Sequence, residues 1–414
     1  MHRIRPLAVS GLAVALILSL ASCSRASSQL STGCRAGVSA PCPDQDPFYD
    51  ASAKALKTRP HGAVLKQRSV FVAVSQVSSL AQASLVLYAS TDRQGHPIAA
   101  STVVLTPKQP YAGQGSRPIL SYQLAYDSLG TGCEPSYTLQ HSSNPGLVNS
   151  PVLVAALQQG WTVVVPDYEG PQALFAIGPQ EGRAVLDGIL AAENAGSGGV
   201  DRSSPVMMWG YSGGALGSAW ASEMQPTYAP KLNVVAVAEG GVPADVKSTI
   251  EEVDGGQYSY LGPLVLVAVA RAYPNAGIIE ALNDKGKQVF KSLQQACPMD
   301  PASTQLANHS LREYTKQPGL LNTPKVAAVF RQLRLGQAAP HSPVYNYEAV
   351  HDGVVPFSSN QTLVHYYCSK GVVVDHVVSD TGDHVSVGAD YAASVLEWLV
   401  TRVEGVPSPN TCPK

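Results

Sequence analysis

Charged side chains are scarce in this sequence of 414 residues, and neither sign of charge dominates. They make up 14% of the residues, and 28 lysines and arginines stand against 30 aspartates and glutamates, for a formal net charge of -2. A protein that binds the phosphate backbone of a nucleic acid needs an excess of basic side chains. We therefore expect no nucleic-acid partner. The sequence also contains no internal repeat, which argues against a helical repeat array.

Two patterns typical of zinc sites are missing. No two cysteines are separated by two residues, and no HExxH motif occurs. These patterns supply the ligands of structural zinc ions and of zinc peptidases. We expect neither a metal nor a cofactor.

The N-terminus lacks an apolar stretch long enough to remain in a membrane as a spanning helix. Residues 7–20 are apolar, but these 14 residues fall short of the roughly 20 that a bilayer requires. Arg3 and Arg5 precede the stretch and small residues follow it, which is typical of a cleaved export signal over residues 1–22. The sequence therefore predicts an exported protein.

Residues 20–23, Leu-Ala-Ser-Cys, resemble the bacterial lipobox, in which the signal is removed before a cysteine that receives lipid. Two outcomes remain open: lipid attachment at Cys23, or ordinary cleavage a few residues later. Membrane association would depend on Cys23 alone, so we expect an extracellular or cell-surface lipoprotein of a bacterium. Residues 23–45 are rich in small residues and proline and are predicted to form a lipidated or flexible tether.

Six of the seven cysteines remain if Cys23 carries lipid. An even number of cysteines in an exported protein indicates disulfides, here three. The sequence does not choose among the 15 possible connectivities. The six residues are Cys34, Cys42, Cys133, Cys297, Cys368 and Cys412.

From Asp46 onward, short apolar runs alternate with helical stretches. Strand-like runs at 70–77, 83–89 and 98–105 predict a meander at the start of a mixed sheet. Runs typical of buried parallel strands follow at 119–124, 162–165, 206–209, 234–238, 344–348 and 372–378. Helices are expected over 180–195, 213–224, 358–368 and 385–403. This order predicts an α/β fold with a mostly parallel sheet flanked by helices.

Residues 242–339 interrupt the alternation, because this segment contains helical stretches and no convincing strand. About a hundred residues of helix between two strands predict a cap over the carboxyl edge of the sheet, where open α/β folds bind ligands. The core would then comprise residues 46–241 and 340–414. A second domain without a role in the site is the alternative.

Gly210, Tyr211, Ser212, Gly213 and Gly214 form the only GxSxG string of the chain. It lies between a strand-like run and a helix-forming run, which is the order of a nucleophile elbow. Such a turn strains the backbone at the serine, and a side chain at Gly210 or Gly214 would collide with the neighbouring strand or helix. The pattern predicts Ser212 as a nucleophile.

A serine nucleophile needs a base to take its proton and an acid to hold the tautomer of that base. In folds with this elbow, the acid and then the histidine follow the serine along the chain. Asp352 lies just after the run 344–348, and His384 lies in a loop after the run 372–378. We predict that Ser212, Asp352 and His384 form a catalytic triad.

Other residues could compete for these roles. His365 falls inside a predicted helix and His376 inside a predicted strand, where packing fixes the side-chain direction, so we expect both to be structural. Asp383 is a rival acid, but it adjoins the base in sequence and is poorly placed to accept its Nδ1 proton. Asp380 is less favoured still.

Two preset N–H donors must hold the oxyanion that develops on the attacked carbonyl. One comes from the residue after the nucleophile, here Gly213, and the other from a loop after an earlier strand. We favour Asp127, in the segment after the run 119–124. No HGGG motif is present there, which weighs against the esterases that use it.

Together with segments spread along the body, these residues resemble the secretory lipase family, of the lipase A type in the α/β-hydrolase superfamily. The matching segments are 46–49, 121–123, 126–128, 133, 135–136, 166–171, 210–214, 240–243, 352 and 355–356. Glu134 departs from the family pattern, which usually has a small residue at that position.

The resemblance implies an α/β-hydrolase fold in which a helical cap forms the acyl-binding pocket and Asp127 contributes to the oxyanion hole. It also implies disulfides between Cys133 and Cys297 and between Cys368 and Cys412. Cys34 and Cys42 would then pair locally.

We therefore expect a serine carboxylester hydrolase of the triacylglycerol lipase type, which acts on acyl esters or lipids through an acyl-enzyme on Ser212. The apolar run 261–270 indicates either a long-chain pocket or a buried cap helix. An acyltransferase or a peptidase of the same fold would share the acyl-enzyme, although the region before Ile119 is too short for the propeller that such peptidases often carry. A lipoprotein that binds lipid without turnover is the non-enzymatic alternative. The sequence does not predict an oligomeric state.

Overall fold

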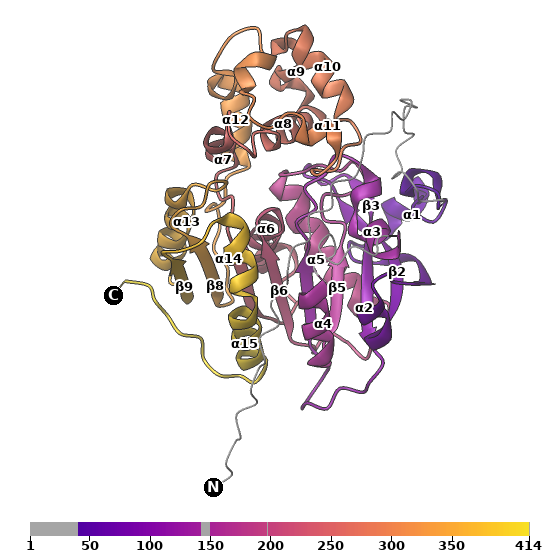
Figure 1. Ribbon diagram of the computed structural model, residues 1–414. Coiled ribbons are helices and arrows are strands. Elements are labelled where there is room, and N and C mark those ends of the chain that lie inside the picture. The colour runs from indigo at the N-terminus through magenta and orange to yellow at the C-terminus, as the bar shows by residue number, and fades with distance from the viewer. Residues whose placement is uncertain (1–39, 142–149, 197, 414) are drawn as a thin grey trace, which may run out of the picture. The chain divides into compact units, whose positions relative to one another are not determined.

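The computed structural model describes residues 40–141, 150–196 and 198–413 (Figure 1). The predicted signal peptide, Cys23 and most of the tether therefore lie outside the described residues. Cys34 also lies outside them, and with it the predicted pairing of Cys34 with Cys42.

In the described part of the chain, nine strands form one mixed sheet in the order β1-β2-β3-β5-β4-β6-β7-β8-β9. The strands β1, β2, β3 and β5 pair antiparallel in this order. The pairs that follow, from β5 through β4, β6, β7 and β8 to β9, are parallel. The parallel strands end at one edge of the sheet, which brings together residues far apart in sequence. The strands are Val64–Val70 (β1), Ala81–Thr91 (β2), Pro97–Pro107 (β3), Ile119–Gln123 (β4), Thr162–Pro166 (β5), Val206–Tyr211 (β6), Val234–Gly240 (β7), Val344–Ala349 (β8) and Val374–Ser379 (β9).

Alternate side chains of the sheet enter two hydrophobic clusters, one on each face. In β6, Val206 and Met208 belong to one cluster, and Met207 and Trp209 belong to the other. Helices α5, α6 and α13 pack in the first cluster, and α4 and α15 in the second. Burial on both faces is the reason that these strands are continuous apolar runs in the sequence, and the predicted fold class is confirmed. The helices outside the segment between β7 and β8 are Ala53–Thr58 (α1), Ser75–Leu80 (α2), Pro135–His141 (α3), Ser150–Gln158 (α4), Gly178–Asn194 (α5), Gly213–Tyr228 (α6), Phe357–Ser369 (α13), His384–Asp390 (α14) and Ala392–Val403 (α15).

The strand predicted over residues 70–77 is wrong. β1 ends at Val70, and α2 begins at Ser75. β1 pairs only with β2 at the edge of the sheet, and its half-exposed polar residues hide it from a search for apolar runs. Buried Val72 and Val74 lie between the two elements, and their spacing imitates the alternation of a strand.

Helices fill the segment between β7 and β8, and Figure 1 shows them gathered beyond one edge of the sheet. A single antiparallel bridge, between Leu282 and Thr315, is the one strand-like pairing in this segment, all of which the structure describes. Its α-helices are Val246–Val253 (α7), Leu261–Ala272 (α8), Ile278–Ala281 (α9), Asp284–Ser292 (α10), Pro301–Thr304 (α11) and Pro324–Gln332 (α12). Within the described ranges, no helix combines the length and hydrophobicity needed to cross a membrane.

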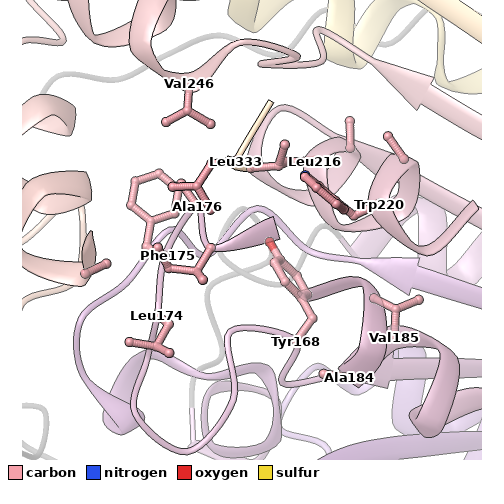
Figure 2. Close-up of a cluster of buried hydrophobic side chains, with 14 of the residues drawn as sticks. Tyr168, Leu174, Phe175, Ala176, Ala184, Val185, Leu216, Trp220, Val246 and Leu333 are labelled. Atoms are coloured by element: carbon pink, nitrogen blue, oxygen red, sulfur yellow. The ribbon is translucent and has the colours of Figure 1, made fainter. Parts of the chain in front are cut away.

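The helical insertion shares a hydrophobic cluster with the core (Figure 2). Val246 of α7 and Leu333, which follows α12, belong to the same cluster as Leu216 and Trp220 of α6. Apolar packing of this kind is the main source of stability between elements. The insertion is therefore joined to the core by continuous hydrophobic contact.

Two disulfides join pairs of described residues, Cys133 to Cys297 and Cys368 to Cys412. Both pairings are those that the family resemblance implies. The first spans 164 residues and links the segment after β4 to the insertion. The second links α13 to the C-terminal segment.

Candidate active site

Ser212 lies in the tight turn between β6 and α6. Its φ of 55° is in the left-handed region, which strains a residue that has a side chain. Its N–H donates to the carbonyl of Gly240 at 2.9 Å. A Cβ at Gly210 would lie 2.2 Å from the carbonyl oxygen of Gly214, and a Cβ at Gly214 would lie 2.0 Å from that of Gln123. Both positions therefore require glycine.

Three side chains from separate strand ends form a hydrogen-bonded chain. The Nε2 atom of His384 lies 2.8 Å from the Oγ of Ser212, and its Nδ1 atom lies 2.6 Å from the Oδ2 of Asp352. The Oδ1 of Asp352 accepts hydrogen bonds from the N–H groups of Val354 and Val355, each at 2.8 Å. Asp352 and His384 are each 8% exposed. In this geometry a histidine can take the proton of a serine while a carboxylate holds the histidine tautomer.

The rival residues have other surroundings. Asp383 is exposed and caps α14 by accepting hydrogen bonds from two N–H groups of its first turn. Asp380 is also exposed. His376 pairs with Glu348 at 2.8 Å, and His365 is exposed on α13. None of these side chains is part of the Ser212 hydrogen-bond chain.

His384 is the first residue of α14 and not a loop residue. The helix predicted over residues 385–403 is two helices, α14 and α15, which meet at Tyr391. Tyr211, to which the sequence assigned no role, donates its hydroxyl to the carbonyl of His384. The GxSxG string therefore supplies both the nucleophile and a contact that fixes the backbone of the base.

The two predicted oxyanion donors lie beside the nucleophile. Gly213 is the first residue of α6, where a backbone N–H has no partner within the helix. Asp127 has a left-handed φ of 43°, and its N–H donates to no acceptor in the described part of the chain. A Cβ at Gly213 would lie 1.9 Å from the Oδ1 of Asp127, so the two residues are in direct contact. Together they can present two N–H groups to an oxygen bound at Ser212.

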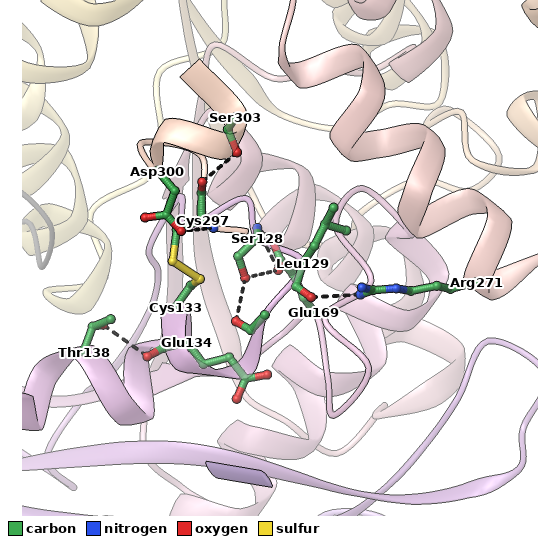
Figure 3. The surroundings of a disulfide bond; sticks show 11 residues. Ser128, Leu129, Cys133, Glu134, Thr138, Glu169, Arg271, Cys297, Asp300 and Ser303 are labelled. Carbon is green, nitrogen blue, oxygen red and sulfur yellow. Dashed lines mark hydrogen bonds between the residues drawn. A yellow bond between two sulfur atoms is a disulfide. The ribbon is translucent and has the colours of Figure 1, made fainter. Parts of the chain in front are cut away.

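A buried carboxylate holds the loop after β4. The Oε2 of Glu169 accepts hydrogen bonds from the N–H of Ser128 at 3.1 Å and from its hydroxyl at 3.2 Å. The N–H of Glu169 in turn donates to the hydroxyl of Tyr126 at 2.7 Å. Arg271 of α8 donates to the carbonyl of Leu129 at 2.9 Å, and this contact ties the loop to the insertion (Figure 3).

Burial raises the pKa of Asp127 to about 6, although the nearby His384 opposes the shift. The residue is partly exposed, but its Oδ1 atom is inaccessible to solvent and accepts no hydrogen bond within the described ranges. Nothing therefore compensates this atom for the water that it loses on folding. The pKa of this carboxyl group therefore lies close to neutral pH.

We expect Asp127→Asn to be more stable than the wild type at pH 8, by about 3 kcal/mol. Because the folded-state pKa is raised, ionisation of Asp127 opposes folding. The penalty is absent below about pH 4, grows as the pH rises to about 6, and is constant above that value. Urea unfolding of both proteins at pH 8 and at pH 4 measures the difference in their free energies of unfolding. Equal stability at both would contradict the burial argument.

A cavity of about 300 Å³ lies beside Ser212, His384 and Asp127. Part of its wall comes from the insertion. Of the apolar run 261–270, only Leu261 lines the cavity. Residues 262–269 are buried, and residues 264–269 belong to the hydrophobic cluster shared with the core. The insertion residues that line the cavity are Tyr258, Tyr260, Leu261, Cys297, Pro298 and Met299.

With this geometry in view, comparison with known proteins identifies the family. A model of the secretory lipase family matches residues 147–411. The chain belongs to the secretory lipase family. The probable inactive lipase MT1628 of Mycobacterium tuberculosis is 35% identical to this secretory lipase, over 88% of this chain and 83% of that protein. The secreted triacylglycerol lipase LIP5 of Malassezia furfur is 33% identical, over 68% of this chain and 75% of that protein.

A solved structure is also similar to this secretory lipase. Candida antarctica lipase A in its closed state matches with a TM-score of 0.83 and 27% identity, over 91% of this chain and 89% of that chain. The family resemblance and the α/β-hydrolase fold are thus confirmed, and the chain is an exported lipase or carboxylesterase. One relative bears the name of a probable inactive lipase, so similarity alone does not assign a catalytic role to any residue of this chain.

Proposed function

We propose that this secretory lipase hydrolyses acyl esters of the triacylglycerol type through an acyl-enzyme on Ser212. The observation that carries the proposal is the hydrogen-bonded chain from Ser212 through His384 to Asp352. A serine hydroxyl is a weak nucleophile at neutral pH. The hydrogen bonds from Ser212 to His384 and from His384 to Asp352 are what activate it. The contact between Gly213 and Asp127 supports the proposal, because it puts two free N–H groups beside the nucleophile.

In the first half of the reaction, the Oγ of Ser212 attacks the ester carbonyl while the Nε2 of His384 takes the serine proton. The oxyanion accepts hydrogen bonds from the N–H groups of Gly213 and Asp127. Collapse of this intermediate breaks the ester bond, and His384 passes its proton to the leaving alkoxide. In the second half, water attacks the acyl-enzyme by the same route and the fatty acid leaves. Asp352 accepts a hydrogen bond from Nδ1 of His384 throughout.

We also propose that residues 242–339 act as a cap over this site. Three features support the assignment: six insertion residues line the catalytic cavity, Arg271 bonds the loop after β4, and the disulfide from Cys133 to Cys297 crosses the boundary. A wall of this kind excludes water from the site and binds the acyl group of the substrate through apolar contact.

At the cell surface, we propose that a bacterial lipid anchor on Cys23 retains the exported enzyme. The support is the lipobox at residues 20–23 and the apolar signal before it. Mass spectrometry of the N-terminal peptide distinguishes a lipid-modified Cys23 from an unmodified terminus farther along the chain. An unmodified terminus would refute the anchor and leave the hydrolase proposal unaffected.

Hydrolysis of p-nitrophenyl esters with two to sixteen acyl carbons tests the substrate class. We expect a maximum at eight or more carbons, because the cavity beside Ser212 is bounded by apolar insertion residues as well as by tyrosines. A maximum at the acetate ester would contradict the lipase assignment and favour a short-chain esterase. A fluorophosphonate probe, with the labelled peptide identified by mass spectrometry, should modify Ser212. Hydrolysis with the label on another serine would contradict the mechanism.

A further inference from the structure

One carboxylate oxygen of Glu134, the Oε1 atom, is buried without a hydrogen-bond partner among the described residues. The residue is 3% exposed, and its Oε1 atom has neither solvent nor a donor in the part of the chain that the structure describes. Figure 3 shows the side chain beside the disulfide of Cys133 and Cys297, with no interaction drawn to its carboxylate. Buried carboxylates are nearly always paired, because the lost hydration of an unpaired one is costly. A hydrogen-bond donor beside this carboxylate would therefore stabilise its ionised form.

Glu134 lines a cavity of about 290 Å³ that shares no lining residue with the cavity beside Ser212. Three more carboxylates line it, those of Asp44, Asp50 and Asp167. No lysine, arginine or histidine lines it. The cavity thus gathers four acidic side chains with no basic side chain in its lining, and a cationic occupant would favour their ionised forms.

Asp167 is held rigidly at this cavity. Its Oδ2 accepts a hydrogen bond from the hydroxyl of Ser101 at 2.5 Å, and its Oδ1 accepts one from the N–H of Ser136 at 2.8 Å. Each oxygen still has a lone pair for a further donor. Burial raises the pKa of Asp167 to about 6, and burial together with the neighbouring carboxyl groups raises the pKa of Glu134 well above its usual value. A cation near both carboxylates would offset these costs.

We propose that this cavity binds a small organic ammonium ion, whose N–H groups donate to the carboxylates of Glu134 and Asp167. The side chain of Tyr49 also lines the cavity and can contact the alkyl part of such an ion. A metal ion suits the site less well, because no group of three or more His, Cys, Asp or Glu side chains within the described ranges could hold one.

Isothermal titration calorimetry with n-butylammonium chloride tests the proposal. The wild type should bind the ion at one site, whereas n-butanol and sodium chloride at equal concentrations should not bind. Glu134→Gln keeps the shape of the side chain and removes its charge, so the affinity should fall at least tenfold. Glu397→Gln makes the same change at an exposed position of α15 and should bind as the wild type does.

Hydrolysis of a p-nitrophenyl ester reports whether each variant is folded, because the two cavities are separate. If Glu134→Gln does not fold, Asp44→Asn changes an exposed carboxylate of the same cavity and should weaken binding severalfold. Unchanged affinity in the folded Glu134→Gln protein would overturn the proposal, as would unchanged affinity in Asp44→Asn where that variant replaces it. Absence of butylammonium binding, or equal binding of n-butanol, would also overturn it. Calcium binding without ammonium binding would assign the cavity to a metal and refute the ammonium site.

Discussion

Ser212→Ala is expected to lower kcat for p-nitrophenyl ester hydrolysis by about 10⁵- to 10⁶-fold, with little change in KM. Without the Oγ atom that lies 2.8 Å from Nε2 of His384, no acyl-enzyme can form. The residual rate should come from the oxyanion donors and from substrate binding alone. Steady-state and single-turnover kinetics on the purified variant measure the loss. Retention of more than about one per cent of kcat would contradict the assignment of the nucleophile.

A second substitution at the same position separates catalysis from folding. Ser212 has a φ of 55°, a conformation that glycine adopts without strain. Ser212→Gly should therefore be as inactive as Ser212→Ala but more stable, by about 1 kcal/mol. Urea unfolding measures this difference. A Gly variant that is less stable than the Ala variant would show that the elbow backbone is not strained in the way that its φ indicates.

The sequence was most informative where a local pattern has one structural meaning. The GxSxG string lies between an apolar run and a helix-forming run, and its glycines are required because a Cβ at Gly210 or Gly214 would lie within 2.2 Å of neighbouring backbone. Asp352 and His384 could be chosen because parallel strands end at one edge of a sheet, so residues after β8 and β9 come close to Ser212. These positions follow from strand order, which the apolar runs reveal.

Other features depend on contacts that no local pattern records. Glu169 lies in the segment 166–171 that carried part of the family resemblance, but its hydrogen-bond partner Ser128 lies 41 residues earlier. No local pattern links these two residues. Similarly, the apolar run 261–270 fits either a pocket or a buried helix. The packing of α8 against the core buries most of the run, so Leu261 is its only residue that lines the cavity. Edge strand β1 was missed because its solvent-facing residues are polar.

Asp352→Asn is expected to lower kcat by about 10³- to 10⁴-fold while leaving the fold intact. The Oδ1 of Asp352 accepts hydrogen bonds from two backbone N–H groups, and the Oδ1 of asparagine can accept the same bonds. The asparagine amide would then face Nδ1 of His384 as a donor, where the carboxylate now accepts at 2.6 Å. This arrangement favours the tautomer with the proton on Nε2, which cannot take the proton of Ser212.

Asp383→Asn is the matched control, because it makes the same change at the residue next to the base. Asp383 is exposed and caps α14, and asparagine is an equally good helix cap, so kcat should stay within about threefold of the wild type. The kcat of both variants is measured with p-nitrophenyl acetate and with a longer ester. A change of acyl preference is then not mistaken for a loss of catalysis. If Asp383→Asn lost as much activity as Asp352→Asn, the neighbouring carboxylate would have to be the acid that orients His384. If neither variant lost activity, His384 would not depend on a carboxylate at all, and the proposed proton path from Ser212 would have to be abandoned.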